Sequence, residues 1–409
     1  MKGIGVKKLF DGTTNKPWED MIVVFDNEKI IDIVNCKYAE SISKKYHITI
    51  ENTEKYMTPG LVDAHVHLML PGDGTSGEDY AKAYPIEEIQ LLALQNAITA
   101  LRCGVTTVRD VGSYYGHARY VRDYCKRAGI GPDILVGGMP LTSTNGHCNY
   151  MGGEADGELE IKKNIRTQMK SGIDFVKLMA TAGGTKGISQ ADPFSFKELC
   201  TAVEESHRLG LKITMHASRM PGLRKAVASG TDGIEHCQFV DQERTVKDQQ
   251  LAEDICKKGI YPCHTLAVNV SGLYTYFKNK PKDTWTEQDK KDYQWQITCQ
   301  ELMPEQLEFQ RSQGVPTIGG SDAGWKFTLF RNAMQISMEM MQKAGMNGLQ
   351  IIHSCTGLCA EALGIEEKQG TIKVGKKADI LLLNQDPEED IKAFYDIDTV
   401  YKNGTFICR

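Results

Sequence analysis

The 409-residue sequence lacks several features that would assign it to a particular class of protein. No run approaches the roughly 20 apolar residues of a membrane span, and no apolar segment near the N-terminus would serve as an export signal. The net charge is −5, and no lysine- or arginine-rich run is present to attract phosphate groups. We therefore expect a cytoplasmic protein that binds neither nucleic acid nor membranes.

The sequence also lacks any Cys-x-x-Cys pair among its twelve cysteines, which excludes a zinc site of that type. Without an export signal, reduced thiols are expected in place of disulfides. The composition, with 41% hydrophobic and 25% charged residues and only 13 prolines, is that of a globular protein. The length exceeds one ordinary domain and fits a (β/α) barrel of about 250 residues with a smaller partner.

Both ends of the chain alternate apolar and polar residues with the period of two that is typical of β-strands. These runs lie at residues 5–10, 21–34, 48–60, 370–384 and 398–409, with Asp, Asn and Gly turns between them. The sequence therefore predicts a small β-sandwich domain formed by residues 1–57 and 365–409.

The middle of the chain, residues 58–364, alternates short strand-like runs with segments whose apolar residues recur at helical spacing. Eight strands are expected, at 61–67, 104–110, 133–139, 173–179, 211–216, 232–236, 260–264 and 315–322. Helices between them include 86–103, 158–171 and 195–209. This α/β pattern predicts a (β/α)8 TIM barrel, with its active site at the C-terminal ends of the strands. The polar segment 275–313 is either a lid over that site or an elongated barrel helix.

Side chains that can bind metals occur at the C-terminal ends of several of these strands. His65 and His67 are two residues apart on the first strand, so both point to the same face. The others are Lys177 on the fourth strand, His216 on the fifth, His236 on the sixth and Asp322 on the eighth. Imidazole and carboxylate together favour Zn²⁺, so the sequence predicts a divalent-metal centre at this rim.

Lys177 is the exception in this set, because an ammonium group cannot bind a metal. It lies in the apolar run at 175–179, where low dielectric and adjacent positive charge would lower its pKa. A neutral amine can add CO₂ and become a carbamate, whose two oxygens could bridge two ions. The alternative is a lysine that pairs with Asp322 or another carboxylate without any metal.

These residues lie in motifs that resemble the amidohydrolase superfamily over the whole chain. The motifs are TPGLVDAHVHL at 58–68, FVKLMATAGG at 175–184, HA at 216–217, IEH at 234–236, GSDAG at 320–324 and GTIKVGKKADILLL at 370–383. The lysine form is similar to the binuclear branch that includes Xaa-Pro, arginine and lysine dipeptidases and imidazolonepropionase-like proteins. The resemblance implies two divalent ions, one held by His65, His67 and Asp322 and the other by His216 and His236, with carbamylated Lys177 bridging them.

This resemblance implies a hydrolase acting on a small amide, and a dipeptide or N-acyl amino acid of the Xaa-Pro or C-terminal basic type is the expected substrate. Two ions about 3.5–4 Å apart would acidify a bridging water, and the hydroxide would attack the carbonyl. Asp322 would take the proton and pass it to the leaving amine. We expect a homo-oligomer whose partner is a small-molecule substrate.

Four residues on rim loops are candidates for contacting that substrate. The resemblance implies that His147, in the run LTSTNGHCNYMGG, binds or polarises the substrate. Arg219 could hold a substrate carboxylate with two hydrogen bonds. The other two candidates are Tyr150, in the same loop as His147, and His264, at the end of the seventh strand.

Two other functions stay open from the sequence: hydrolysis of a cyclic amide, as in imidazolonepropionases, and an inactive scaffold. Deamination is disfavoured, because related deaminases carry a glutamate three residues after the fifth-strand histidine, where Arg219 stands here. A scaffold is disfavoured because inactive relatives have lost ligands, whereas every ligand position is filled in this chain.

Overall fold

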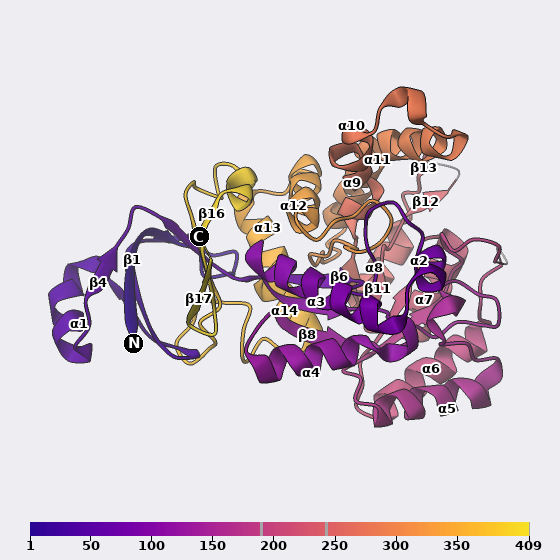
Figure 1. The fold of residues 1–409 in the computed structure, drawn as a ribbon, viewed down its shortest axis with the longest axis horizontal. Helices are drawn as coiled ribbons and strands as arrows, with labels where there is room; N and C mark the ends of the chain where they lie inside the picture. The colour runs from indigo at the N-terminus through magenta and orange to yellow at the C-terminus, as the bar shows by residue number, and fades with distance from the viewer. Residues whose placement is uncertain (189–190, 242–243, 409) are drawn as a thin grey trace.

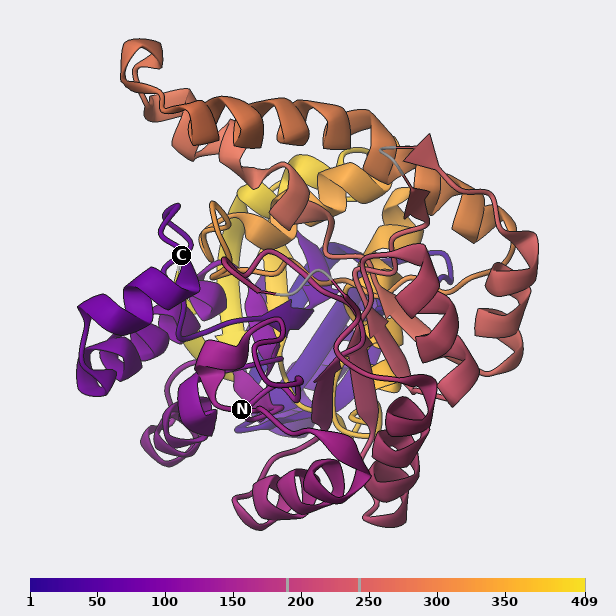
Figure 2. The ribbon, with the colours of Figure 1, turned by 90° about the vertical axis from the view of Figure 1, so that its right-hand side faces the viewer.

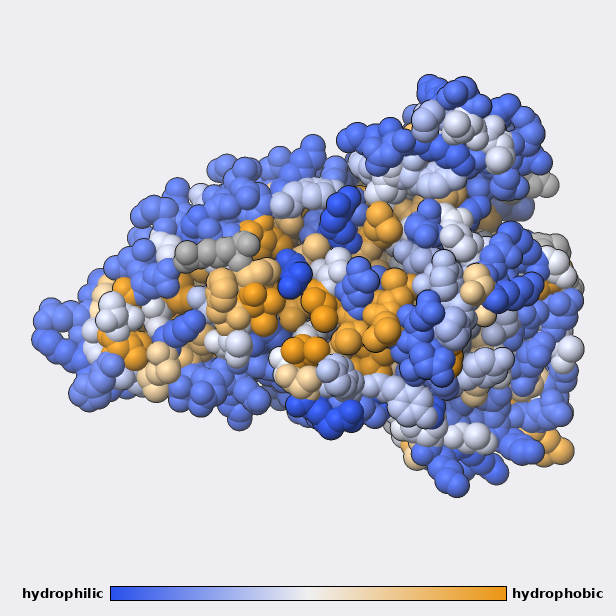
Figure 3. Space-filling view, in the orientation of Figure 1, coloured by the Kyte–Doolittle hydropathy of each residue, from blue (hydrophilic) through white to orange (hydrophobic). Residues whose placement is uncertain are grey.

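The computed structural model describes residues 1–188, 191–241 and 244–408, and it has two parts (Figure 1). The strands from the two chain ends lie at the left of this view, and the barrel with its helices lies at the right. None of the helices within the described ranges combines the length and the apolar character needed to cross a membrane. The same face carries mostly hydrophilic residues, and hydrophobic ones gather around α3 (Ile86–Arg102) at its centre (Figure 3).

The two chain ends form one sheet in the order β17-β16-β15-β5-β1-β2-β3, with β4 beside β1. Its strands are β1 (Lys2–Leu9), β2 (Trp18–Asp26), β3 (Lys29–Asn35), β4 (Ile50–Asn52), β5 (Tyr56–Pro59), β15 (Ile380–Leu383), β16 (Ile397–Lys402) and β17 (Thr405–Cys408). Phe25 of β2 contacts Tyr401 of β16 with ring centroids 5.3 Å apart, although three strands separate them in the sheet. The sheet therefore folds over on itself, as expected of a sandwich. Strand β5 of this sheet continues past residue 57, where the sequence places the boundary between sandwich and barrel. The domain boundaries stay a prediction.

The barrel wall consists of short parallel strands joined into a ring. They are β6 (Leu61–Val66), β7 (Val105–Asp110), β8 (Asp133–Val136), β9 (Val176–Met179), β10 (Ile213–His216), β11 (Gly233–Glu235) and β14 (Tyr261–Cys263). Bridges between Leu141 and Leu178, Cys263 and Ile318, and Val66 and Ala323 connect the remaining neighbours. The predicted (β/α)8 barrel is thus confirmed, with every predicted strand in place except the last.

The eighth predicted strand, residues 315–322, is not a regular strand but pairs through isolated bridges at Ile318 and Ala323. Single backbone hydrogen bonds, such as Asp322 N to the His65 carbonyl oxygen at 2.8 Å, add to these bridges. At Gly320 the backbone passes too close to the adjacent strands to carry a side chain. A Cβ on Gly320 would lie 2.2 Å from the Cys263 sulfur and 3.2 Å from the His65 Cβ. Glycine at this position lets the segment approach both β14 and β6 and so place Asp322 beside His65.

Helices surround the strands in a ring, as seen along the barrel in Figure 2. Besides α3 they are α2 (Gly77–Ala83), α4 (Ala118–Ala128), α5 (Gly157–Lys170), α6 (Phe196–Arg208), α7 (Met220–Ser229), α8 (Gln249–Lys257), α12 (Ala333–Lys343), α13 (Gly348–Ser354) and α14 (Gly357–Leu363). The short α1 (Ala39–Tyr46) instead packs Ile42 against the outer face of the sheet. A capping box of Ser195 and Glu198 sets the start of α6, within a residue of the predicted position.

The long polar segment 275–313 is mainly one helix, α11 (Glu287–Ser312), which runs along the upper edge of Figure 2. It is preceded by the short helices α9 (Ser271–Tyr274) and α10 (Tyr276–Asn279). Thr286 and Asp289 form a capping box that starts α11. The N-terminal half of α11 borders the main cavity, so the segment combines an elongated helix with a wall of the site.

Candidate active site

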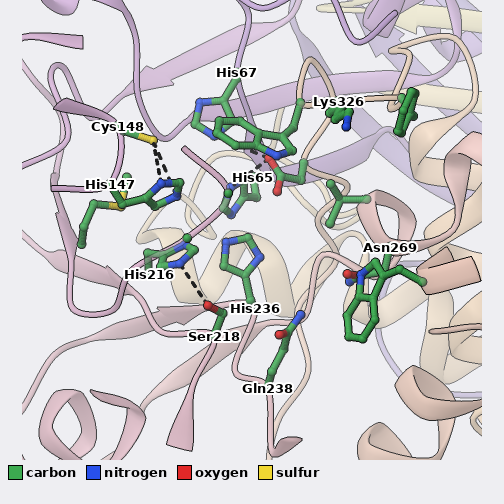
Figure 4. A pocket seen from close by; sticks show the side chains of 18 of the residues that line it. His65, His67, His147, Cys148, His216, Ser218, His236, Gln238, Asn269 and Lys326 are labelled. Carbon is green, nitrogen blue, oxygen red and sulfur yellow. Dashed lines mark hydrogen bonds and ion pairs between the residues drawn. The ribbon is translucent and has the colours of Figure 1, made fainter. Parts of the chain in front are cut away.

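A cavity of about 490 Å³ opens at the C-terminal ends of the barrel strands (Figure 4). All six residues predicted to bind metal line it: His65, His67, Lys177, His216, His236 and Asp322. They come from five separate strands or strand ends, so the barrel closure alone brings them together. Strand ends that are far apart in the sequence thus form one site.

The histidine rings form a continuous series across the floor of the cavity. His65 lies 5.5 Å from His67 and 5.1 Å from His236, measured between ring centroids. His216 lies 4.5 Å from His236 and 4.7 Å from His147. His236 has a positive φ of 70°, a backbone state that non-glycine residues seldom adopt and that is common at functional sites.

Three of these side chains converge on one buried point. Asp322 Oδ1 lies 3.4 Å from His65 Nε2 and 3.5 Å from His67 Nε2. Ligand atoms about 2.1 Å from a tetrahedral ion are about 3.4 Å apart. Neither His65 Nε2 nor Asp322 Oδ1 has a hydrogen-bond partner among the described residues, although both atoms are buried. The residues present therefore fit a divalent ion at this point, and His236 lies close enough to join them.

The other nitrogen of each of three imidazoles is held by an outer partner. His67 Nδ1 lies 2.9 Å from the Gly112 carbonyl oxygen, which can only accept a hydrogen bond. His236 Nδ1 lies 2.7 Å from the Thr265 hydroxyl, and His65 Nδ1 lies 2.6 Å from Glu235. In His65 and His67 the proton is thereby fixed on Nδ1, which leaves Nε2 free to donate its lone pair into the cavity.

Glu235 provides the strongest of these outer contacts. Its Oε2 accepts a hydrogen bond of 2.6 Å from His65 Nδ1, and its Oε1 accepts one of 2.6 Å from the Arg109 guanidinium. Thr214 also donates to Oε1. Burial opposes the charge on Glu235, but Arg109 and His65 hold its pKa well below the usual range. A fixed anion therefore stands behind His65.

The electrostatics of the site keep most of the imidazoles neutral, which is the form that binds metals. Burial lowers the pKa of His67 to about 4 and that of His236 to about 3. It lowers the pKa of His216 well below its ordinary value. Burial also opposes a charge on His65, but the negative charges of Asp322 and Glu235 together raise its pKa. The same two carboxylates favour a cation at this place.

Lys177 is fully enclosed in the barrel, with 1% of its surface exposed. Burial lowers the pKa of its amine, and Arg109 lowers it further, against the opposing effect of Glu235 and Asp322. Among the described residues, none forms a hydrogen bond or an ion pair with the Lys177 amine. Among the described residues, the structure therefore shows no ion pair between Lys177 and Asp322, the alternative considered from the sequence.

His147 also lines the cavity, at the end of the histidine series next to Trp325. Its Nδ1 lies 2.7 Å from the Thr185 hydroxyl, and burial lowers its pKa to about 3. A Cβ on Gly183 would lie 2.4 Å from its Nε2, so the glycine makes room for the ring. His147 is thus placed to face a substrate as a neutral imidazole.

The other three residues predicted to contact substrate are not among the residues that line this cavity, and their contact with substrate stays a prediction. Tyr150 packs against Tyr114 with ring centroids 5.7 Å apart, away from the cavity lining. Arg219 is exposed before α7, outside the cavity wall. His264 is buried behind the wall, where its Nε2 lies 3.0 Å from Gln310 Oε1.

Several residues of the site were missed by sequence reasoning. Glu235 stands inside the IEH motif and could have been noticed as the neighbour of His236. Trp325 follows the GSDAG motif and contacts both His67 and His147. Gln238, Asn269 and Trp295 also line the cavity, and no sequence motif contains them.

A barrel with this rim of histidines, aspartate and lysine defines a metal-dependent type of hydrolase site, and comparison with known proteins gives the family. The model of the amidohydrolase family matches residues 56–407, so the chain belongs to that family. The chain is accordingly a hydrolase that acts on carbon–nitrogen bonds of amides or peptides. Members of this family generally use divalent metals.

Individual relatives are distant. Ochratoxinase of Aspergillus niger is 25% identical over 92% of this chain and 81% of its own length. Imidazolonepropionase of Mesorhizobium japonicum is 23% identical over 82% of this chain and 79% of its own length. A crystal structure of a Xaa-Pro dipeptidase with bound methionine superposes with a TM-score of 0.82 at 25% identity, covering 99% of both chains.

Proposed function

We propose that the protein hydrolyses the amide bond of a dipeptide or an N-acyl amino acid in this cavity. The main support is the convergence of His65, His67 and Asp322 on one buried point. His65 Nε2 and Asp322 Oδ1, which face this point, have no hydrogen-bond partner among the described residues. The similarity to a Xaa-Pro dipeptidase supports a linear amide as the substrate.

The proposed metal centre consists of two divalent ions, for which the donor set favours zinc. His65, His67 and Asp322 would hold one ion, and His216 and His236 the other, with a carbamate on Lys177 between them. When bound, such ions supply a nucleophile from water at neutral pH and polarise the substrate carbonyl. Homo-oligomer formation and a cytoplasmic location stay predictions from the sequence.

Lys177 would acquire its carbamate by a simple addition. The lowered pKa favours the neutral amine, whose lone pair adds to the carbon of CO₂ with loss of one proton. The product carries one negative charge and two oxygens in place of a buried neutral amine. This change would give the ions an anionic ligand.

Asp322 and His147 would handle the proton and the carbonyl oxygen. Burial opposes the charge of Asp322, but His65, His67 and His236 hold its pKa below the ordinary value. Its carboxylate can accept the proton of the attacking water and deliver it to the leaving amine. The Thr185 hydroxyl accepts from Cys148 N–H and can donate to His147 Nδ1, which leaves a proton on Nε2 for the carbonyl oxygen.

A cyclic amide is the second candidate, because imidazolonepropionases are among the relatives. Ring opening and linear cleavage use the same chemistry but differ in their products. A cyclic substrate gives one molecule carrying both new groups, whereas a linear amide gives two.

The test is metal analysis of the purified protein together with a screen of dipeptides, N-acyl amino acids and cyclic amides for amine release. We expect two divalent ions per chain and cleavage of at least one linear amide. The Asp322→Asn variant should lose that activity. A protein with less than one metal per chain that cleaves no amide would refute the proposal.

A further inference from the structure

Two carboxamide side chains, those of Gln238 and Asn269, line the cavity on the side away from His147, with Gln238 next to His236 (Figure 4). Asn269 is buried, with 8% of its surface exposed, and its Nδ2 has no hydrogen-bond partner among the described residues. Within the described part of the chain, neither carboxamide forms a side-chain hydrogen bond. Because an unsatisfied buried amide is costly, its partner should come from the contents of the cavity.

Asn269 is held firmly in this position. It is the last residue of the 3-10 helix η4 (Leu266–Asn269), in which Ala267 N donates to the Ser337 hydroxyl at 3.2 Å. The residue just before this helix, Thr265, contacts His236 Nδ1 at 2.7 Å. The loop that orients a proposed metal-binding histidine therefore also fixes Asn269. Gln238 lies two residues after the same histidine.

The charged side chains that line the cavity outside the proposed metal centre are already paired with other side chains. Lys326 forms an ion pair with Asp292 at 2.5 Å, and Lys186 forms one with Asp79 at 2.8 Å. A third carboxamide on the wall, Gln288, donates to Asp292 at 3.0 Å. The polar groups left to meet a ligand here are neutral, and Trp295 supplies an apolar surface in the same cavity.

A carboxamide presents both a hydrogen-bond donor and an acceptor. A carboxylate could use only the donors and would bring its charge against the carboxamide oxygens. A neutral amide can satisfy both groups at once. The wall therefore matches a ligand that carries a neutral amide next to an apolar stem.

We propose that Gln238 and Asn269 form a specificity subsite that binds a neutral carboxamide of the substrate, such as a glutamine side chain, and rejects the isosteric carboxylate. The subsite rests on the proposed amide hydrolysis and narrows its substrate class. The two residues act in binding, since neither is among the groups assigned to the metals or the proton.

The test compares isosteric dipeptides in both orders, with glycine joined to glutamine, glutamate or methionine. In one of the two orders, kcat/KM for the glutamine peptide should exceed the other two by about 10-fold, the size expected for a buried hydrogen bond that is lost. The Asn269→Leu variant should reduce this ratio to near one while keeping the metal content of the wild type. The matched control Gln288→Leu, a carboxamide that already has a partner, should keep the preference.

A binding experiment separates this inference from the proposed function. Calorimetric titration with the free amino acids glutamine, glutamate and methionine, which contain no peptide or N-acyl bond to cleave, measures the subsite without turnover. Preferential binding of the glutamine compound that is lost in Asn269→Leu supports the subsite even if no amide is cleaved. Equal rates in both peptide orders with equal affinities, or a preference that persists in both Asn269→Leu and Gln238→Leu, would overturn it.

Discussion

The Glu235→Gln variant is expected to weaken metal binding by disturbing His65. Both oxygens of Glu235 act as acceptors, one from His65 Nδ1 and the other from Arg109 and Thr214. An amide has one acceptor oxygen and one NH₂ donor. Whichever way the new carboxamide is turned, one donor faces another donor. If the NH₂ group faces His65, the imidazole must move its proton to Nε2 and lose the lone pair that faces the cavity.

The size of the effect follows from these contacts. Loss of an outer partner of a metal-binding histidine typically weakens metal affinity by about 10–100-fold, or about 1.4–2.7 kcal/mol. The substitution also leaves the buried Arg109 without its anion, and breaking a buried pair costs about 3–5 kcal/mol of stability. We therefore expect weaker metal binding together with a lower melting temperature.

Metal affinity is best measured by competition with a chelator of known affinity, and stability by thermal unfolding in the same buffer. The matched control is Glu205→Gln on α6, where the carboxylate also joins two cations, Arg166 and Arg208, at 2.7 and 2.6 Å. This control should lose stability but keep its metal. An unchanged metal affinity in folded Glu235→Gln protein would refute the role assigned to Glu235.

Three further predictions concern the loop around His147 and the dependence on pH. His147→Ala should lower kcat by about 100-fold with little change in metal content, as measured by steady-state kinetics and metal analysis. Gly183→Ala should produce a similar defect, because its Cβ would lie 2.4 Å from His147 Nε2, and a fully active variant would contradict that contact. In the metal-free protein, the free energy of unfolding should fall as the pH drops from about 6.5 to 4. Burial lowers the pKa of His67 and His264 to about 4 and that of His147 and His236 to about 3, so the unfolded chain takes up these protons first. The lowered pKa of His216 adds a fifth group to this set. Burial raises the pKa of Asp63 to about 6 and that of Asp110 to about 7, and the raised pKa of His65 acts in the same direction, so these three groups offset only part of the effect. Urea unfolding at about pH 7 and about pH 5 measures the balance, and greater stability at the lower pH would contradict it.

The sequence predicted the barrel and the gathering of its rim residues because both depend on strand periodicity. The position of a residue at a strand end determines which rim it reaches, so His65, His216 and Asp322 could be brought together without coordinates. The direction of a side chain on a loop follows no such rule. Arg219 and His264 are therefore not among the residues that line the cavity. Asn269 lines it from a 3-10 helix, which the periodicity of the sequence did not predict.

The eighth strand shows the same limit within the barrel wall. Its residues were located correctly, but regular pairing is replaced by bridges at Ile318 and Ala323, because the glycines between them permit a closer approach than a strand would. The partner of Lys177 is another case. Its burial could be inferred from the apolar run, whereas the lack of an ion pair with the described residues depends on the packing of several strands.

The metal content of the Lys177→Ala variant tests the central claim most directly. The account predicts two divalent ions per wild-type chain, loss of metal and activity in the variant, and partial recovery of both when a short-chain carboxylate such as propionate is added. A folded Lys177→Ala protein that keeps two ions and full activity without added carboxylate would contradict the account.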